Sequence, residues 1–320
     1  MRFLFHRPAD TALPVGFFQK GGFSVQLRTP ARRKEWWIAL GLIAPAVLLR
    51  AFSTLYPIVQ TFINSFFNLS YLSAQKGKFI GFDNYTKMFR DIFVVDSFEF
   101  TLLFTIISML FHVVLGVLLA VMLNVHYKGQ RFLRTITLIP WAMPVVVAAQ
   151  AGRFMFNDQF GLINDLIRRV VPSFSHDWLV KASSARAAVI AVDVWKDVPF
   201  FAILVLATLQ FMPTEIYESA RIDGASAVKS FFYITIPNIA KTIFTISIFF
   251  TMWRISSFDI VYGMTSGGPS NSTSLLAYQI SVVAFRKMNL GYASAMAVVL
   301  FLIMAVLAIV NLRLSKCFDS

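Results

Sequence analysis

Apolar residues gather in six long runs along the chain, separated by shorter polar stretches. Each run holds roughly 20 or more residues, which as a helix rising about 1.5 Å per residue crosses a hydrocarbon layer about 30 Å thick. The runs are residues 37–63, 98–123, 135–156, 187–211, 242–263 and 292–312. They predict an all-α, polytopic membrane protein with a tail at 1–36, a transmembrane domain at 37–312 and a second tail at 313–320.

The amino-acid composition narrows the possible class of protein further. Hydrophobic residues make up 57% of the chain and charged residues only 14%, whereas soluble domains carry roughly 25% charged residues. Cys317 is the only cysteine, so an intrachain disulfide cannot form. These values exclude an ordinary soluble globule, an intrinsically disordered chain and a disulfide-stapled scaffold.

Basic residues predict the orientation, because cationic loops stay in the cytoplasm. They precede the first run, follow the second and precede the fifth: Lys20, Arg28, Arg32, Arg33 and Lys34; Lys128, Arg131 and Arg134; Arg221, Lys229 and Lys241. Both termini are therefore expected in the cytoplasm. The net charge of +13 is explained by this bias and by contact with anionic membrane lipid. No nucleic-acid partner is expected, since no DNA-binding motif accompanies the charge.

The segment 213–237, between the fourth and fifth runs, has the pattern of two short helices. Pro213 and Thr214 can start the first helix and Gly224 can stop it. A second helix can start at Ser226, carry apolar residues on one side and end at Pro237. From the residues alone, this segment fits either a docking element or an amphipathic linker lying on the membrane.

The order of residues in this segment resembles the EAA loop of bacterial ABC importer permeases. The matching positions are Glu218-Ser219-Ala220, then Gly224, then Ile234-Thr235-Ile236-Pro237. Ser219 and Ile236 depart mildly from the usual alanine and leucine. In that family the loop forms a cytoplasmic coupling helix that sits in a cleft of the ATPase. The resemblance assigns ATPase coupling to Glu218, Ser219, Ala220, Arg221, Asp223, Gly224 and Ala225.

Three further stretches, with the rest of the loop, are similar to sugar-importer permeases of the MalF and UgpA type. They are Leu209 to Pro213, Thr265 to Pro269 and Leu290 to Ala295, so the resemblance covers about the second half of the chain. It implies the six-helix fold of a type I ABC importer permease in the bacterial inner membrane. The chain also resembles the permease of an alginate importer, which takes up an acidic oligosaccharide.

The resemblance implies a division of labour among subunits. This chain would be non-catalytic, beside a second permease subunit, two cytoplasmic ATPase subunits and a periplasmic solute-binding protein that delivers a carbohydrate. ATP and Mg would be bound by the ATPase subunits and no cofactor by this chain. Its own residues agree, because no phosphate-binding loop is present: Gly77-Lys78 lacks the upstream glycine and the following hydroxyl.

Two other classes of function fit the sequence less well. An ion-gradient-driven secondary transporter or channel would show internal repeats and would not require the cytoplasmic loop; no clear repeat is visible. A membrane-embedded enzyme would need catalytic groups at matching depths, and no nucleophile, base and orienting group can be assembled. The importer permease remains the favoured interpretation, with transport by alternating access.

Ionisable and aromatic residues within the runs are candidates for the solute path, because charges inside a membrane usually face a cavity or a bundle interior. The candidates are Arg50, Arg153, Asp193, Trp195, Lys196, Asp197, Trp253, Arg254 and Asp259. Aromatic faces stack on sugars and forked polar groups bind hydroxyls. The alternative is that Asp193 pairs with Lys196, and Arg254 with Asp259, only to neutralise charge.

Two more expectations concern charge and metals. The four cations among these candidates exceed the three acids by one, which would suit an acidic saccharide. No metal site is expected, because four scattered histidines and one cysteine provide no ligand cluster. His112 is therefore interpreted as a hydrogen-bonded packing residue.

Overall fold

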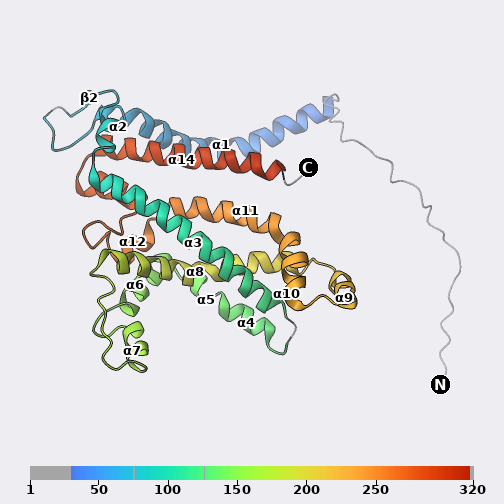
Figure 1. Cartoon of the computed structure of the whole chain (residues 1–320). Coiled ribbons are helices and arrows are strands. Elements are labelled where there is room, and N and C mark those ends of the chain that lie inside the picture. The colour runs from blue at the N-terminus through green and yellow to red at the C-terminus, as the bar shows by residue number, and fades with distance from the viewer. Residues whose placement is uncertain (1–29, 75, 126, 318–320) are drawn as a thin grey trace, which may run out of the picture. The chain divides into compact units, whose positions relative to one another are not determined.

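A computed structural model describes residues 30–74, 76–125 and 127–317 of the chain, and it is built almost entirely from helices (Figure 1). The longest are α1 (Pro30–Asn64), α3 (Ile92–Asn124), α8 (Ala182–Leu209), α11 (Ile236–Ile255) and α14 (Leu290–Cys317). The shorter helices are α2 (Asp83–Met88), α4 (Gln130–Thr137), α5 (Ile139–Ala142), α6 (Val145–Met155), α7 (Leu162–Arg168), α9 (Thr214–Ile222), α10 (Ala227–Ser230), α12 (Asp259–Met264) and α13 (Leu276–Ser281). Two π-helical turns, η1 (Phe231–Thr235) and η2 (Val282–Arg286), precede α11 and follow α13. The all-α prediction is confirmed.

The chain divides into two units, residues 1–56 and residues 57–320. The described part of the first unit is the N-terminal portion of α1, whose apolar side chains, such as Leu42 and Leu49, are exposed as suits a helix in lipid. The expected N-terminal tail lies outside the described residues up to position 29, but residues 30–36 are already helical. At the other end α14 continues through Cys317, into the region expected as a tail, of which 318–320 lie outside the described residues.

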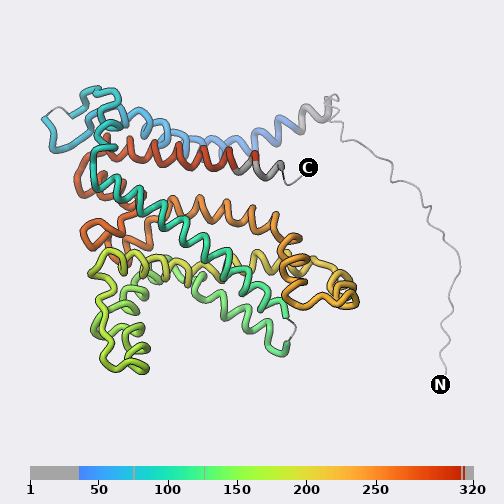
Figure 2. Tube along the Cα trace, in the orientation of Figure 1, coloured from blue at the N-terminus to red at the C-terminus, as the bar shows by residue number. Residues whose placement is uncertain are grey.

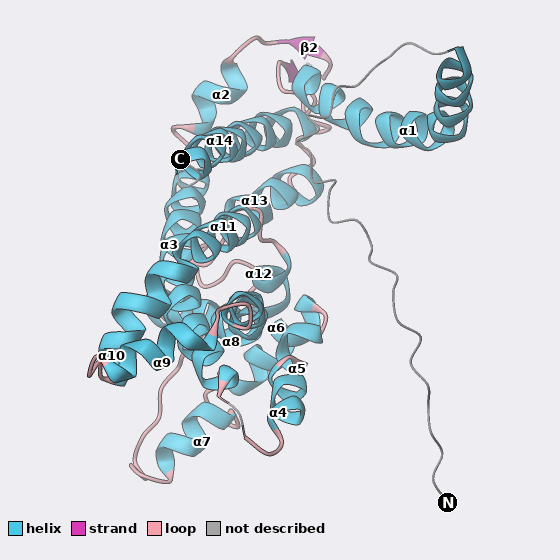
Figure 3. Ribbon diagram, turned by 90° about the vertical axis from the view of Figure 1, so that its right-hand side faces the viewer, coloured by secondary structure: helices cyan, strands magenta, loops and turns pink. Residues whose placement is uncertain are grey.

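In the second unit, α8 is the central helix. It contacts α3, α5, α6, α11 and α12, which surround it when the unit is viewed along its axis (Figure 3). Large side chains fill the spaces between these helices, among them Phe100, Phe104, Phe201 and Phe250, all fully buried. The helices therefore form a packed bundle, in which buried apolar area and dense contacts stabilise the arrangement.

The small two-stranded sheet, β1 (Phe67–Asn68) and β2 (Lys78–Phe79), pairs antiparallel with Phe67 opposite Phe79. It stands in the loop between α1 and α2. Residues 69–71 also pair with the stretch before α14, through Tyr71 N to Met288 O and Leu290 N to Leu69 O. Asn84 of α2 donates to the backbone oxygens of Ser65 and Phe67, which fixes the end of α1 and the start of β1 against α2.

Two of the predicted spans differ from the helices in the structure. The third, 135–156, is not one straight helix: residues 130–142 and 145–155 meet at 91°. Met143 is extended there and Pro144 starts α6, because proline lacks the N–H that would continue the helix. The fifth, 242–263, is wrong at its end: α11 stops at Ile255, and α12 is a separate helix packed against α6.

Four described helices are long and apolar enough to cross a membrane, and the bent pair gives up to five. They are α1, α3, the continuous helix 227–255 and α14, with α4–α6 as the bent pair. The central helix α8 is not among them, although its 28 residues would extend about 42 Å. It differs from these helices because three charged residues, Asp193, Lys196 and Asp197, lie within its apolar stretch.

Candidate functional site

The loop between α8 and α11 contains α9 and the start of a second helix, α10, and both begin where the residues predict. Pro213 precedes α9, and Ser226 starts α10 by accepting a hydrogen bond from Lys229 N with its side chain. The loop lies at the end of α8 remote from α7, which the tube view makes clear (Figure 2). It therefore occupies one end of the helical unit.

The end of α9 explains the spacing of the loop's small residues. Gly224 has a φ of 77°, the left-handed conformation that favours glycine. Its N–H donates to Arg221 O at 3.1 Å, and Ala225 N donates to Ala220 O at 2.9 Å. These two bonds are a Schellman motif, in which the last carbonyls of a helix are satisfied as the chain reverses. Ala220, Gly224 and Ala225 thus shape the turn.

The side chains of this loop are largely free of the rest of the chain. Of the residues assigned to coupling, Glu218, Ser219, Arg221, Asp223 and Gly224 are exposed, and Ala220 and Ala225 are half-buried. Large apolar side chains are exposed beside them: Ile222 is 87% exposed and Tyr233 80%. Charged and apolar groups together on an exposed, hydrogen-bonded turn are typical of a surface that another protein covers.

One hydrogen bond attaches α9 to the helix that follows. Tyr217 OH and Thr235 Oγ1 share a bond of 3.0 Å, and Thr235 is buried in η1. The expectation that the second short helix ends at Pro237 is wrong. Residues 227–255 run on through α10, η1 and α11, with Pro237 in the first turn of α11, where its missing N–H costs nothing. The second half of the loop is therefore continuous with α11.

The charged residues of α8 and α11 meet in one buried cluster. Arg254 Nη2 donates to Asp197 Oδ2 at 2.7 Å, and Arg254 Nε lies 2.8 Å from Asp193 Oδ2 as an ion pair without hydrogen-bond geometry. Lys196 Nζ donates to Asp197 Oδ1 at 3.0 Å and to the backbone oxygen of Trp141 at 3.4 Å. None of the four charged side chains is more than 6% exposed.

His112 of α3 completes this cluster. Its Nδ1 lies 2.6 Å from the backbone oxygen of Ser108, which can only accept, so Nδ1 carries the proton and donates. Nε2 then accepts from Arg254 Nη2 at 3.1 Å. Three helices are joined in this way at one guanidinium. His112 is a hydrogen-bonded packing residue, as expected, but its contact with Arg254, 142 positions away, was missed because no sequence spacing indicates it.

The cluster is neutral, because two cations face two carboxylates. Mutual neutralisation was one of the two interpretations of these residues, but the expected partners were wrong. Asp197 rather than Asp193 pairs with Lys196, and Arg254 pairs with the α8 acids rather than with Asp259. A helix turn places residues three and four apart on one face, so spacing alone could not decide between partners on α8 and on another helix.

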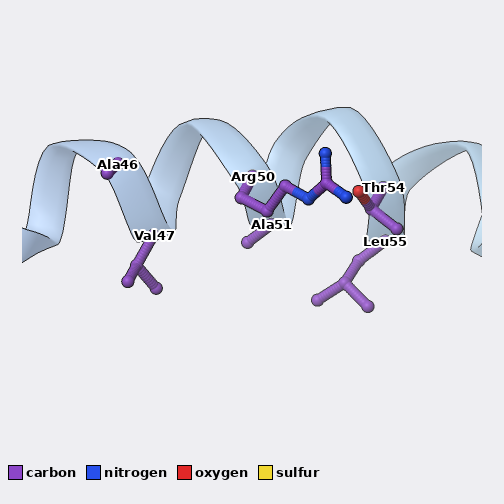
Figure 4. A pocket seen from close by; sticks show the side chains of 6 residues that line it. All are labelled: Ala46, Val47, Arg50, Ala51, Thr54 and Leu55. Atoms are coloured by element: carbon purple, nitrogen blue, oxygen red, sulfur yellow. The ribbon is translucent and has the colours of Figure 1, made fainter. Parts of the chain in front are cut away.

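The remaining candidates are exposed and form none of the ion pairs described above: Arg50, Arg153, Trp195, Trp253 and Asp259. Trp253 has its ring 5.7 Å from the Arg254 guanidinium, so it borders the cluster. Arg50 sits in the first unit, in a shallow hollow of α1 lined by Ala46, Val47, Ala51, Thr54 and Leu55. Its side chain runs along the helix toward Thr54 (Figure 4).

Residues 112–318, more than half of the chain, match the family described as binding-protein-dependent transport system inner membrane component. The sulfoquinovosyl glycerol transport system permease protein SmoG of Agrobacterium fabrum is 36% identical over 88% of this chain and 94% of its own length. The trehalose/maltose transport system permease protein MalF of Thermococcus litoralis is 32% identical, over 91% and 97%.

The fold is also similar to a solved structure, a bacterial ABC transporter involved in the import of the acidic polysaccharide alginate. That likeness has a TM-score of 0.78 and 20% identity, and it covers 91% of this chain and 99% of the other. The family match over residues 112–318 includes the broken third helix, the central α8 and the exposed loop described above. The chain belongs to the binding-protein-dependent transport system inner membrane components, the permease subunits of ABC importers.

Proposed function

We propose that this chain is the solute-conducting permease of a carbohydrate importer, in which separate subunits hydrolyse ATP and the α9–α10 loop receives their motion. The observation that carries this proposal is the position of the loop. It joins α8 directly to α11, and the Arg254 cluster holds these two helices together inside the bundle. A displacement of the loop therefore moves both helices as one body.

The proposed docking surface on the ATPase subunit is formed by Glu218, Ser219, Ala220, Arg221, Asp223, Gly224 and Ala225. Its exposed charges and apolar side chains favour a protein partner over a lipid surface. A lipid-bound helix would need its apolar residues on one continuous face, whereas here Ile222 and Tyr233 are exposed on separate elements. ATP and Mg would be held by two such ATPase subunits, and no cofactor by this chain.

Six membrane crossings fit the structure if α8 is counted with α1, α3, α4–α6, α10–α11 and α14. The charges that distinguish α8 are neutralised inside the bundle, so lipid would not meet them. The basic loop after α3 and the α9–α10 loop lie at one end, since Arg134 contacts Gln210. That end is proposed to be cytoplasmic, together with both termini.

The family description implies an external solute-binding protein, and a second permease subunit would complete the pathway. Relatives of this chain are named for a sulfoquinovosyl glycerol system and a trehalose/maltose system, which supports a carbohydrate. Arg153 is the candidate cation of the helical unit that lies outside the neutral cluster, and a bacterial alginate importer shares the fold, so an acidic saccharide is the preferred solute. Trp195 and Trp253 are the proposed stacking residues and Arg153 the proposed anion contact.

Reconstitution of the purified complex in vesicles tests this function. ATP hydrolysis is measured with the binding protein present, while neutral disaccharides and acidic oligosaccharides are added in turn. We expect hydrolysis to rise with one saccharide class, and Arg153→Gln to reduce transport of an acidic solute while Arg153→Lys retains it. Equal stimulation without any saccharide, or unchanged acidic transport in Arg153→Gln, would contradict the assignment.

A further inference from the structure

We propose that Arg134 is a positioning residue for energy coupling: it fixes the direction in which the coupling helix α9 leaves α8, and it ties that helix to the broken third span. This inference rests on the proposed function of the loop. It concerns a residue on α4, which is outside the EAA-like segment and far from it in sequence.

Arg134 binds the end of α3. Its Nε and Nη2 donate to the backbone oxygen of Leu123 at 3.2 and 2.9 Å, and Gln130 Nε2 donates to the same oxygen at 2.9 Å. Leu123 is in the last turn of α3, where carbonyls have no partner within the helix. The guanidinium therefore replaces the missing helical bonds at that end.

Arg134 also binds the end of α8. With its amide oxygen turned toward α4, Gln210 accepts from Arg134 Nη1 at 2.7 Å and from Nη2 at 2.9 Å. Gln210 is the residue that caps α8, and Pro213 begins the approach to α9 only three positions later. The bonds Phe211 N to Thr208 O and Met212 N to Leu209 O keep this connection tight.

The C-terminal ends of three helices meet at this one cation, because Arg134 also lies in the last turn of α4. Each such end carries partial negative charge, which a cation stabilises. The planar guanidinium can reach Leu123 O and Gln210 at once, whereas a lysine ammonium is a single point charge without that fork. The site thus needs arginine rather than any positive residue.

Beside the chain itself, α9 is then held through Gln210 and through the Tyr217 hydroxyl, which contacts Thr235 Oγ1 and Met212 Sδ. The first leads into α4 and onward to α5, where the backbone oxygen of Trp141 accepts from Lys196. A displacement of the coupling helix would therefore reach the bend of the third span as well as α8 and α11. Loss of Arg134 would remove the attachment to α4 and leave only the backbone and the Tyr217 hydroxyl to hold α9.

The experiment compares Arg134→Lys, Gln210→Ala and the control Arg131→Lys, an exposed residue on the same helix. Each variant is purified with its partner subunits, and solute transported per ATP hydrolysed is measured at equal amounts of assembled complex. We expect both test variants to assemble and to lose severalfold in that ratio, with Arg131→Lys unchanged. The double variant Arg134→Lys with Gln210→Glu should recover part of the loss through a direct ion pair.

The proposal is overturned if Arg134→Lys and Gln210→Ala assemble and transport as much solute per ATP as the unaltered chain. It is also overturned if they fail only by reduced assembly, which would show a structural role. Failure of the unaltered chain itself to assemble with an ATPase would instead refute the proposed function. In Gln210→Ala the bonds from Arg134 to Leu123 are kept, so this variant still tests the coupling role if Arg134→Lys misfolds.

Discussion

Arg254 Nη2 lies 2.7 Å from Asp197 Oδ2, and both side chains are buried between α8 and α11. These two helices are the ones that flank the α9–α10 loop. Charges removed from water are held only by their partners, so the pair is a fixed link between the helices. In a transporter driven from the loop, such a link makes the two helices respond together.

Arg254→Gln should strongly destabilise the protein. Removing the cation leaves Asp193 and Asp197 buried without compensation, which costs about 3–5 kcal/mol. Thermal unfolding in detergent, followed by the loss of monodisperse protein, measures this change. Arg153→Gln is the matched control, because Arg153 is exposed. Adding Asp193→Asn to Arg254→Gln should restore part of the stability. If the stability losses of the two single variants simply add in the double variant, the two residues do not interact and this account of the cluster is wrong.

Gly224→Val should impair coupling while the membrane helices stay folded. Gly224 has open space around its Cα, so the cost arises from its φ of 77°, at which a side chain costs about 1–2 kcal/mol. The Schellman turn would distort, and ATPase stimulation should fall. Gly77→Val is the control, since Gly77 has a φ of 86° and equal space but lies between β1 and β2. Equal stimulation in both variants would mean that the turn is unimportant.

Gly116→Val should loosen the bundle. A Cβ at Gly116 would lie 2.5 Å from Cδ1 and 3.4 Å from Cβ of Phe201, whose ring is fully buried, so α3 and α8 would have to separate. Overpacking of this kind costs roughly 1–3 kcal/mol. Melting of the detergent-purified protein reports the effect. In Gly41→Val nothing lies within 4 Å of the new Cβ, and this variant should melt like the unaltered chain.

Tyr217→Phe should loosen the coupling helix without unfolding it. The change removes the hydroxyl that bonds to Thr235, a loss of about 0.5–1.5 kcal/mol. Cleavage by trypsin after Arg221 should become faster, because local opening exposes the loop. Tyr233→Phe removes a hydroxyl from a side chain that is 80% exposed and should leave the cleavage rate unchanged. Identical rates for the two variants would argue against the attachment.

Much of the fold could be read from the sequence because lipid imposes a simple rule. Long apolar runs must be helices, and turn residues such as Gly224 and Ser226 mark short ones. The end of the fifth helix was misplaced because apolar residues, Phe258, Ile260, Val261 and Tyr262, follow soon after α11 stops. Ser256 ends the helix by donating its hydroxyl to the oxygens of Met252 and Trp253, a local competition that hydropathy does not reveal.

The contacts that organise the site could not be predicted from spacing. Arg254 pairs with Asp193 and Asp197 on α8 rather than with Asp259, which is only five positions away in sequence. Helix packing, and not sequence distance, brings these groups together. Arg134 was recognised only as a topogenic charge. Its contact with Gln210 depends on how α3, α4 and α8 converge, which no local pattern contains. The loop residues, in contrast, were assigned from their resemblance to a family motif, and their role in coupling stays a prediction.

The most direct test of the central claim is site-specific crosslinking of the loop in the assembled complex. Ser219 is exposed, and Cys317 is the only cysteine, so S219C in a C317S background carries one photoreactive thiol label. S173C, in the exposed loop after α7, is the control. We expect S219C to crosslink to an ATPase subunit, in a yield that changes with bound ATP, and S173C never to do so. Labelling of lipid alone from S219C, or equal ATPase labelling from both positions, would contradict the proposed coupling site.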